Sequence, residues 1–244
     1  MTDDASIQVP TFQSHGLHWP RDIKPTAVAH AFKHVKGIDL AISMCGQRRR
    51  AVQAGGNIGL WPRRIARSFE RVTTFEPEPV THACLVRNVA DAANIEVHHA
   101  ALGAERGTAR IVRESLASHH LAEGEGTQVL VLDEFGFHDV DLIQLDVEGF
   151  ELNALKGARE TIMRCRPIIQ LEIRGFTEAY GGSDADVVAF LEGCNYRQAA
   201  ELLGSDFLFA PAERPVPRSL LSLIEGGKVR LRRLLRGSPR AAGH

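Results

Sequence analysis

The sequence has few cysteines, and they lie far apart. Cys45, Cys84, Cys165 and Cys194 include no C-x-x-C pair, which argues against a zinc knuckle or a disulfide framework. The first residues, MTDDA, are acidic and precede no apolar segment, so a signal peptide is not expected. There is also no N-x-S/T glycosylation acceptor. The cysteine pattern fits a reduced, cytoplasmic setting best.

Long apolar runs and an excess of one charge are missing as well. No run approaches the roughly 18 apolar residues of a membrane span, so we expect none. The formal net charge is −1, which argues against a molecule built to hold a polyanion such as a nucleic acid. The composition is ordinary for a soluble globular protein, with 44% hydrophobic and 24% charged residues. A chain of 244 residues is long enough for one large domain, with or without extensions.

Three glycines, Gly55, Gly56 and Gly59, stand between an apolar run at residues 51–54 and a helical pattern over residues 58–69. A strand, a tight turn and a helix in this order direct backbone N–H groups and a helix N-terminus at a ligand. Glycine allows positive φ and leaves no Cβ between the chain and that ligand. An ordinary connection from strand to helix also uses glycines, so the turn by itself is a weak signal.

An acidic residue follows the next expected strand. Residues 71–75 end at Glu76, about twenty residues beyond the glycines, where an acid accepts hydrogen bonds from ribose hydroxyls. A solvated charge at a strand end is the alternative, but turn and acid together favour a nucleoside cofactor. The dinucleotide fingerprint G-x-G-x-x-G has Ala54 in its first place, and Gln53 stands where a methyltransferase turn usually has an acid. Both patterns are imperfect, so the turn does not decide between them.

Strand and helix patterns alternate from residue 51 onward. They predict a doubly wound α/β sheet that ends in an antiparallel hairpin, which is the layout of the class I methyltransferase (Rossmann-like) fold. The runs at 108–113 and 127–132 predict an inserted hairpin. Strands are expected at 51–54, 71–75, 95–101, 140–145, 167–173, 195–200 and 206–210, and helices at 58–69, 79–92, 151–164 and from the N-cap pattern at 183–186 to Gly193.

Segments of different composition flank this pattern. We expect an N-terminal extension over residues 1–50, irregular up to residue 24 and then helical at 25–35 and 37–45, and a main domain over 51–212. Residues 213–244 hold eight Arg or Lys against two Glu, a net charge of about +6, with leucines at helical spacing. Such a basic amphipathic tail can contact an anionic surface or a partner. A frayed helix docked on its own domain is an equally good interpretation.

Residues 146–151 read DVEGFE after the apolar run at 140–145. Here the chain resembles the FkbM-type methyltransferases, whose signature is a D-V-E-G-x-E segment after an apolar strand. The resemblance extends over roughly residues 51–210 and includes the glycine turn, Phe75-Glu76-Pro77, Asn88 and the AALG segment at 100–103. It implies methyl transfer from S-adenosylmethionine, usually to a hydroxyl of a sugar, polyketide or similar small molecule. The cofactor-binding residues that it implies are Gln53, Gly55, Gly56, Asn57, Gly59, Glu76, Ala101, Leu102 and Asp146.

Three acidic residues at strand ends are the candidates for chemistry. Methyl transfer requires that a nucleophile lie in line with the sulfonium methyl and lose its proton. We expect Asp146 to position the methionine part of the cofactor or the acceptor, and Glu148 or Glu172 to contact the acceptor hydroxyl. Helix caps or arginine partners are the alternative for these acids, and for Glu151 we favour such a structural role.

Histidine pairs in the sequence do not predict a metal centre. His98 and His99 point to opposite faces of a strand, and His119 and His120 lie in the insert, so neither pair presents two ligands together. The DVEGFE block contains no histidine, and we predict no metal there. Loops of this kind often contact ligands, so the insert residues Ser115, Ser118 and His119 are further candidates for contact with the cofactor or acceptor.

Two other classes of function compete with the methyltransferase. A nicotinamide-dependent oxidoreductase uses a similar sheet, but Tyr180 and Tyr196 are the only tyrosines and neither begins a Tyr-x-x-x-Lys pair. A non-catalytic module that binds a partner through the basic tail remains open because of Gln53. N-methylation is less expected than O-methylation, since no Asn/Asp-Pro-Pro-aromatic motif follows the run at 140–145.

Overall fold

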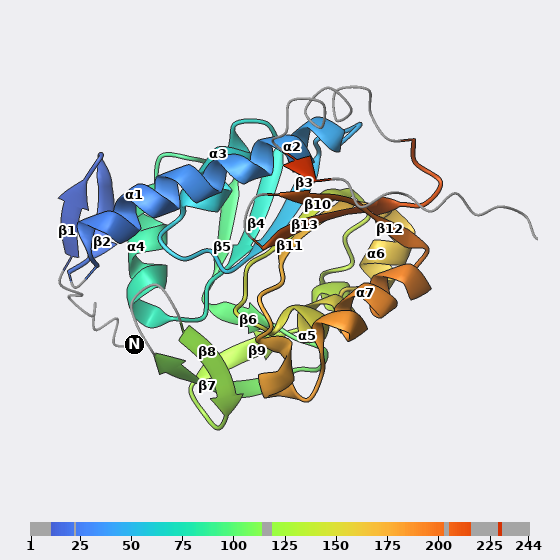
Figure 1. Ribbon diagram of the computed structural model, residues 1–244. Coiled ribbons are helices and arrows are strands. Elements are labelled where there is room, and N and C mark those ends of the chain that lie inside the picture. The colour runs from blue at the N-terminus through green and yellow to red at the C-terminus, as the bar shows by residue number, and fades with distance from the viewer. Residues whose placement is uncertain (1–10, 22, 114–118, 203–204, 216–228, 231–244) are drawn as a thin grey trace, which may run out of the picture.

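A mixed eight-stranded sheet forms the centre of the computed structural model, which describes residues 11–21, 23–113, 119–202, 205–215 and 229–230 (Figure 1). The strand order is β14-β12-β13-β11-β10-β3-β4-β5, and β11, β10, β3, β4 and β5 are parallel neighbours. The antiparallel hairpin of β12 and β13 closes the sheet, so the predicted class I methyltransferase fold is confirmed. The strands are β3 (Arg50–Ala54), β4 (Arg71–Phe75), β5 (Ile95–His98), β10 (Val140–Leu145), β11 (Ile168–Glu172), β12 (Tyr196–Leu202), β13 (Asp206–Pro211) and β14 (Val229–Arg230).

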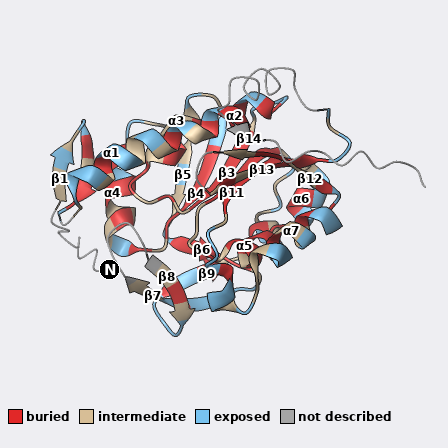
Figure 2. Ribbon diagram, in the orientation of Figure 1, coloured by how far each residue is buried: buried red, intermediate tan, exposed pale blue. Residues whose placement is uncertain are grey.

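Two apolar cores lie on the two faces of this sheet, because successive side chains of a strand alternate between faces. Leu142 of β10 packs in one core with Ile38 and Ile65, whereas its neighbour Ile143 packs in the other with Leu155. Figure 2 shows the central strands as buried. The first core is covered by α2 (Ile38–Met44) and α3 (Leu60–Ala66), and the second by α5 (Glu151–Lys156), α6 (Arg159–Cys165) and α7 (Asp184–Gly193).

The N-terminal segment is more ordered than its sequence predicts. Residues expected to be irregular form a hairpin of β1 (Thr11–Ser14) and β2 (Leu17–Pro20), followed by α1 (Pro25–His34) and η1 (Val35–Gly37). Asn88 of α4 (Pro79–Val89) accepts a hydrogen bond from the backbone N–H of His18 at 2.7 Å and donates one to its carbonyl at 2.8 Å. The hairpin is therefore fixed by a residue about seventy positions away, which local periodicity does not reveal.

The expected strand at 95–101 is divided between two sheets. β5 ends at His98, and β6 (Ala100–Leu102) instead pairs in parallel with β9 (Thr127–Leu130). β7 (Gly107–Arg113) pairs antiparallel with β9, as the inserted hairpin predicts, but also with β8 (His119–Glu123), which the sequence did not indicate. The insert is therefore a four-stranded sheet of order β6-β9-β7-β8, and η2 (Leu132–Phe135) leads from it to β10.

The helix expected at 151–164 is interrupted after Lys156. Asp133 of η2 accepts hydrogen bonds from the backbone N–H groups of Glu160 and Thr161 at 2.9 and 2.8 Å, so the second half has its own N-terminal cap. Gly157 lies against Gly103, where an added Cβ would be 1.9 Å from the carbonyl oxygen. The cap from Asp133 and the close approach of Gly157 to Gly103 therefore divide the expected helix into α5 and α6. By contrast, α7 begins with the predicted cap, in which Ser183 and Asp186 form a capping box.

Of the C-terminal tail, the structure describes residues 213–215 and β14, which pairs with β12. The predicted helical leucines lie at residues 220–224 and 231–235, outside the described residues, and the boundaries at residues 50 and 212 remain predictions. Within the described ranges, no helix has the length and apolar character needed to cross a membrane.

Replacing Gly157 with alanine is expected to destabilise the fold. The new Cβ meets the backbone of Gly103, which no side-chain rotation can relieve, and overpacking of this kind costs about 1–3 kcal/mol. Urea unfolding measures the effect. Gly193→Ala is the matched control, because a Cβ at that helical position meets nothing within 4 Å. Equal stability of the two variants would contradict the close approach of Gly157.

Glu151 holds the loop between β10 and α5, in line with the structural role expected for it. Its buried Oε1 accepts hydrogen bonds from the backbone N–H groups of Val147 and Gly149 at 3.1 and 3.4 Å. Burial raises the pKa of this carboxyl from 4.5 to about 7. The folded protein therefore binds this proton more tightly than the unfolded chain, and the resulting stability is complete below pH 4.5 and lost as the pH rises through about 7.

Substitution Glu151→Gln is expected to flatten this pH dependence. The amide oxygen still accepts both N–H groups but carries no titrating proton, so the variant should gain stability relative to wild type between about pH 5 and about pH 8. Urea unfolding at both pH values provides the test, with the exposed Glu70→Gln as control. If the difference in unfolding free energy between wild type and Glu151→Gln is the same at both pH values, Glu151 does not titrate in this range.

Candidate functional site

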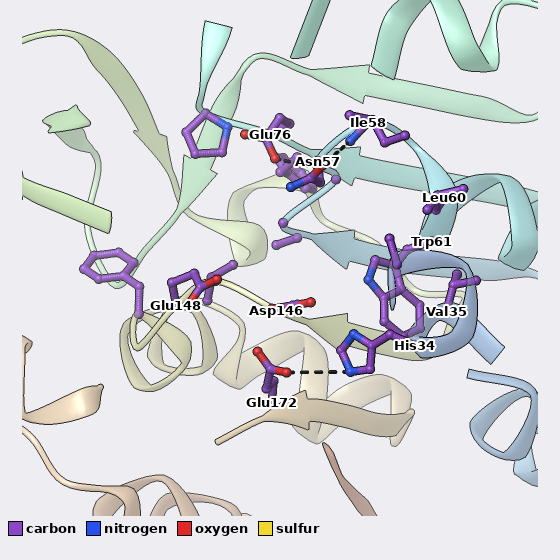
Figure 3. Close-up of a pocket in the computed structure, with 18 of the residues that line it drawn as sticks. His34, Val35, Asn57, Ile58, Leu60, Trp61, Glu76, Asp146, Glu148 and Glu172 are labelled. Carbon is purple, nitrogen blue, oxygen red and sulfur yellow. Dashed lines mark hydrogen bonds and ion pairs between the residues drawn. The ribbon is translucent and has the colours of Figure 1, made fainter. Parts of the chain in front are cut away.

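A cavity of about 480 Å³ opens at the carboxyl ends of the parallel strands, where ligands bind on such sheets. Figure 3 shows Glu76 and Asn57 at one end of it, His34 and Glu172 at the other, and Asp146 between them. One face of α1 forms an opposite wall, and Leu121 of the insert also reaches the cavity. The predicted residues that line it are Gly55, Gly56, Asn57, Glu76, Ala101, Leu102, Asp146, Glu148 and Glu172.

The glycine turn folds tightly over the ends of two neighbouring strands. The N–H groups of Gly55 and Gly56 both donate to the carbonyl of Phe75, at 3.0 and 2.9 Å. Gly55 has φ +83°, and an added Cβ would lie 1.8 Å from the carbonyl oxygen of Asp146. A Cβ on Gly56 would lie 2.8 Å from the side chain of Leu85. Only glycine meets both requirements at Gly55, namely positive φ and no Cβ.

Glu76 is held through both of its carboxylate oxygens. Its Oε2 accepts a hydrogen bond from the backbone N–H of Asn57 at 2.6 Å, which ties the acid to the glycine turn. Its Oε1 accepts from the N–H of Glu78 and the hydroxyl of Thr81, both at 2.9 Å. The carboxylate is therefore fixed in position before any ligand arrives, an arrangement that reduces the entropy lost on binding.

Two of the predicted cofactor residues do not line the cavity. Gln53 is buried on a face of the sheet, where its amide oxygen accepts a hydrogen bond from Thr74. It lies in register with Gln144 of β10, which in turn lies in register with Gln170 of β11. Gly59 has φ +97° at the N-cap of α3 and faces Leu85. The turn therefore contributes Gly55, Gly56 and Asn57 to the cavity, while Gln53 and Gly59 support it from behind.

Acidic groups gather at the other end of the cavity. Asp146 follows β10 and Glu172 ends β11, and the two carboxyl groups share a hydrogen bond. Burial, together with the charge of Asp146, raises the pKa of Glu172 to about 9, so this carboxyl is neutral at pH 7. Burial also raises the pKa of Asp146. The guanidinium of Arg174 contacts Oε1 of Glu172, and Ser205 donates to the same oxygen at 3.3 Å.

Glu148 takes a different position from the other two predicted acids. Its backbone has φ +53°, and the next residue, Gly149, has φ +99°. This left-handed pair turns the chain directly after Asp146. Figure 3 shows Glu148 on the side of the cavity opposite His34. Glu148 and Glu172 therefore flank Asp146 rather than forming a single group with it.

His34 and Asp206 belong to the site but were not found from the sequence. His34, the last residue of α1, lines the cavity, and its Nε2 lies 3.0 Å from Oδ2 of Asp206 and 3.7 Å from Oε1 of Glu172. Asp206 begins β13, opposite Glu172 in the antiparallel register. The expected helix at 25–35 was the available signal for His34, but no periodicity indicates which histidine of that helix meets the sheet.

The same three residues have a spacing that can hold a cation, since their ligand atoms lie within 4.8 Å of one another. These atoms already have partners, however. His34 bonds to Asp206, and the Glu172 oxygen accepts from Ser205 and pairs with Arg174. A guanidinium beside the same carboxyl oxygen would repel a metal ion. We therefore assign this group to hydrogen bonding.

His98 and His99 differ in their surroundings, although β5 ends at His98 and His99 lies between two strands, and the other pair, His119 and His120, lies in β8 rather than in a loop. His98 stacks on Phe75 with ring centroids 4.8 Å apart, whereas His99 stacks on His82 at 4.2 Å, so the two side chains have different neighbours. Ser115, Ser118 and the side chain of His119 lie outside the described part of the chain.

Comparison with known proteins gives one family and several similar structures. Residues 53–198 match the profile described as methyltransferase FkbM domain. The search of curated protein sequences returned no match. The structure is similar to methyltransferase FkbM from Methylobacillus flagellatus KT, with 23% identity and a TM-score of 0.48 over 67% of this chain and 43% of that one. This chain therefore spans less than half the length of that protein.

Two further similar structures share less sequence with this chain. The rRNA methylase from Streptococcus thermophilus is 14% identical, with a TM-score of 0.45 over 77% of this chain and 95% of that one. The N-methyltransferase NodS from Bradyrhizobium japonicum WM9 is 12% identical, with a TM-score of 0.44 over 74% and 93%. The family assignment depends on the profile match, which covers more than half of the chain and contains the glycine turn, Glu76 and the DVEGFE block. This protein belongs to the FkbM family of methyltransferases.

Proposed function

We propose that this protein transfers the methyl group of S-adenosylmethionine to a hydroxyl of a sugar, polyketide or similar small molecule. One observation carries the proposal. A single cavity is lined at one end by Glu76, which is held beside the glycine turn, and toward its other end by the carboxyl groups of Asp146 and Glu172. Its volume of about 480 Å³ is within the range of small-molecule sites.

The end of the cavity near Glu76 fits the nucleoside of the cofactor. The Glu76 carboxylate, held in place by Asn57, Glu78 and Thr81, is a hydrogen-bond acceptor at the position where ribose hydroxyls are suitable donors. Ala101 and Leu102 present small or apolar surface next to this position, which suits an adenine ring. Gly55 and Gly56 line the cavity as well, and their backbone can lie against the chain that joins ribose to methionine.

The acidic end fits the methionine part and the acceptor. Asp146 lies between the two ends, where a carboxylate attracts the methionine ammonium group or orients an acceptor hydroxyl. Glu172 is neutral at pH 7, because its pKa is about 9, and so offers a hydrogen-bond donor as well as an acceptor. Glu148, on the opposite wall, can contact the far side of an acceptor.

The reaction itself asks two things of the protein. The sulfonium already makes the methyl carbon electrophilic, so the enzyme must hold the acceptor oxygen in line with the C–S bond. Orientation of this kind contributes up to ~7–11 kcal/mol in intramolecular systems. Removal of the hydroxyl proton by a positioned base contributes about 10²–10⁴-fold more.

The departure at Gln53 does not weigh against cofactor binding. Gln53 bonds to Thr74 on a face of the sheet and does not line the cavity. A glutamine in place of the usual acid at this position therefore leaves the cavity walls unchanged. This favours the methyltransferase over a non-catalytic module that has lost its ligand. The four cysteines are free thiols, which agrees with the proposed cytoplasmic setting.

Replacement Glu76→Ala is expected to weaken S-adenosylmethionine binding about 10- to 100-fold. The variant removes charge-assisted hydrogen bonding to ribose, for which we expect a net loss of the size of one such bond, ~1.5–3 kcal/mol, and it frees the N–H of Asn57. Calorimetric titration of wild type and variant with S-adenosylmethionine and with its demethylated product measures the loss. The exposed Glu70→Ala is the matched control and should bind like wild type.

Titration of the wild type with NAD separates the competing functions. Micromolar binding of both adenosyl ligands without binding of NAD supports the proposal. Binding of NAD alone would instead indicate an oxidoreductase. If the wild type binds none of the three, the methyltransferase proposal is wrong and a partner-binding module takes its place.

A further inference from the structure

His34 lines the cavity but lies outside residues 53–198, the family segment that matches the FkbM domain. It ends α1, whereas the profile match begins at residue 53. Its ring contacts Trp61 edge-on, with centroids 5.4 Å apart, and is stacked with His30 at 5.9 Å. Figure 3 shows the imidazole next to Glu172 at the same end of the cavity, with Asp146 near both. A titratable group therefore lies at the acceptor end, contributed by the N-terminal segment.

The two ring nitrogens of His34 have different surroundings. Nε2 lies 3.0 Å from Oδ2 of Asp206, a buried carboxyl, and 3.7 Å from Oε1 of Glu172. A carboxylate oxygen accepts hydrogen bonds, so Nε2 carries the hydrogen. Among the described residues, Nδ1 has no hydrogen-bond partner. The neutral ring therefore keeps the lone pair of Nδ1 available to a ligand in the cavity.

We propose that His34, positioned by Asp206, accepts the proton of the acceptor hydroxyl during methyl transfer. This inference deepens the proposed function and rests on it. In the step, the acceptor oxygen forms a bond to the methyl carbon while the C–S bond breaks and its electron pair stays on sulfur, which becomes a neutral thioether. The hydroxyl proton goes to Nδ1, and the carboxylate of Asp206 stabilises the imidazolium that results.

Glu172, the acid expected to contact the acceptor hydroxyl, is less suited to take its proton. Its carboxyl is neutral at pH 7 because its pKa is raised to about 9. Its Oε1 is also occupied by Arg174 and Ser205. A neutral acid with an occupied oxygen can hold the acceptor by a hydrogen bond but does not deprotonate it. The imidazole of His34, next to Glu172, is therefore the better proton acceptor.

The charges around His34 determine how the proposed base depends on pH. Asp206 faces it from β13, Glu172 and Arg174 from the end of β11, Asp146 from the end of β10, and His30 from α1 itself. The hydrogen bond to Asp206 outweighs burial and raises the pKa of His34 above 6.5. Because the neutral ring is the base, activity should rise with pH through this raised pKa.

The first test needs no acceptor. NMR titration of the His34 imidazole, assigned by its loss in His34→Gln, should give a pKa above 6.5 in wild type, with hydrogen on Nε2 in the neutral form. In Asp206→Asn the pKa should fall, because the carboxylate that favours the charged ring is gone. A wild-type value at or below 6.5, or one unchanged in Asp206→Asn, would overturn the proposal.

The second test measures turnover as release of S-adenosylhomocysteine with methyl α-glucoside, phenol and butylamine as probes. With the better hydroxyl probe, His34→Gln should lower kcat by about 10²-fold or more and abolish the rise of activity with pH. Asp206→Asn should move that rise to lower pH. The exposed His138→Gln, distant from the cavity lining, is the control and should behave like wild type.

Cofactor binding distinguishes the two proposals. If wild type binds no S-adenosylmethionine, the proposed function itself has failed. If binding is within about threefold of wild type in His34→Gln but kcat and the pH profile are unchanged, only the role of His34 is wrong. Methylation of butylamine in preference to both hydroxyl probes would also contradict the role of His34.

A metal is a further outcome of the test. If a divalent cation restores activity to chelator-treated protein, His34, Glu172 and Asp206 hold a metal instead. Because His34→Gln lies at a half-exposed helix end, it tests the proposal even if Asp206→Asn does not fold.

Discussion

The close approach of Gly55 to the end of β10 is the constraint on which the site depends. With no Cβ, the turn after β3 lies directly over the carbonyl of Asp146, only 1.8 Å from where a side-chain carbon would be. The same turn is tied to β4 through the carbonyl of Phe75 and to Glu76 through the N–H of Asn57. Three strand ends are thereby held together, so Glu76 and the acids Asp146 and Glu172 line one cavity.

The rest of the cavity wall comes from the N-terminal segment. Asn88, within the family segment, bonds to both backbone groups of His18 and also donates to the carbonyl of Ile58. It therefore links the β1–β2 hairpin to the loop before α3 and fixes where α1 begins. α1 then brings His34 to the sheet. Residues outside the family match thus line the end of the cavity at which we propose that the acceptor binds, and segments of this kind often carry the specificity of a fold.

Burial of acids at one sheet edge gives this end its chemistry. Parallel strands place their carboxyl ends together, and the antiparallel β13 adds its first residue, Asp206, to the same edge. The pKa of Glu172 is high because its carboxyl is buried and because the charge of Asp146 lies beside it. A carboxyl with a raised pKa and an imidazole with a raised pKa then lie side by side. Such shifted pKa values are what acid–base chemistry requires.

The sequence by itself determined the order of strands and helices, because alternating apolar patterns reflect local burial that each segment needs wherever it packs. It also identified the glycine turn, Glu76, Asp146, Glu148 and Glu172, since these residues stand at strand ends that a parallel sheet must bring together. Only the tertiary structure decided the break at Gly157, the transfer of β6 to a second sheet, the positions of Gln53 and Gly59 behind the cavity, and the meeting of His34 with Asp206. Each of these depends on a contact between distant segments: Gly157 with Gly103, β6 with β9, Gln53 with Thr74, and α1 with β13. Local periodicity contains no information about such contacts, and for that reason the fold was predictable while part of its chemistry was not.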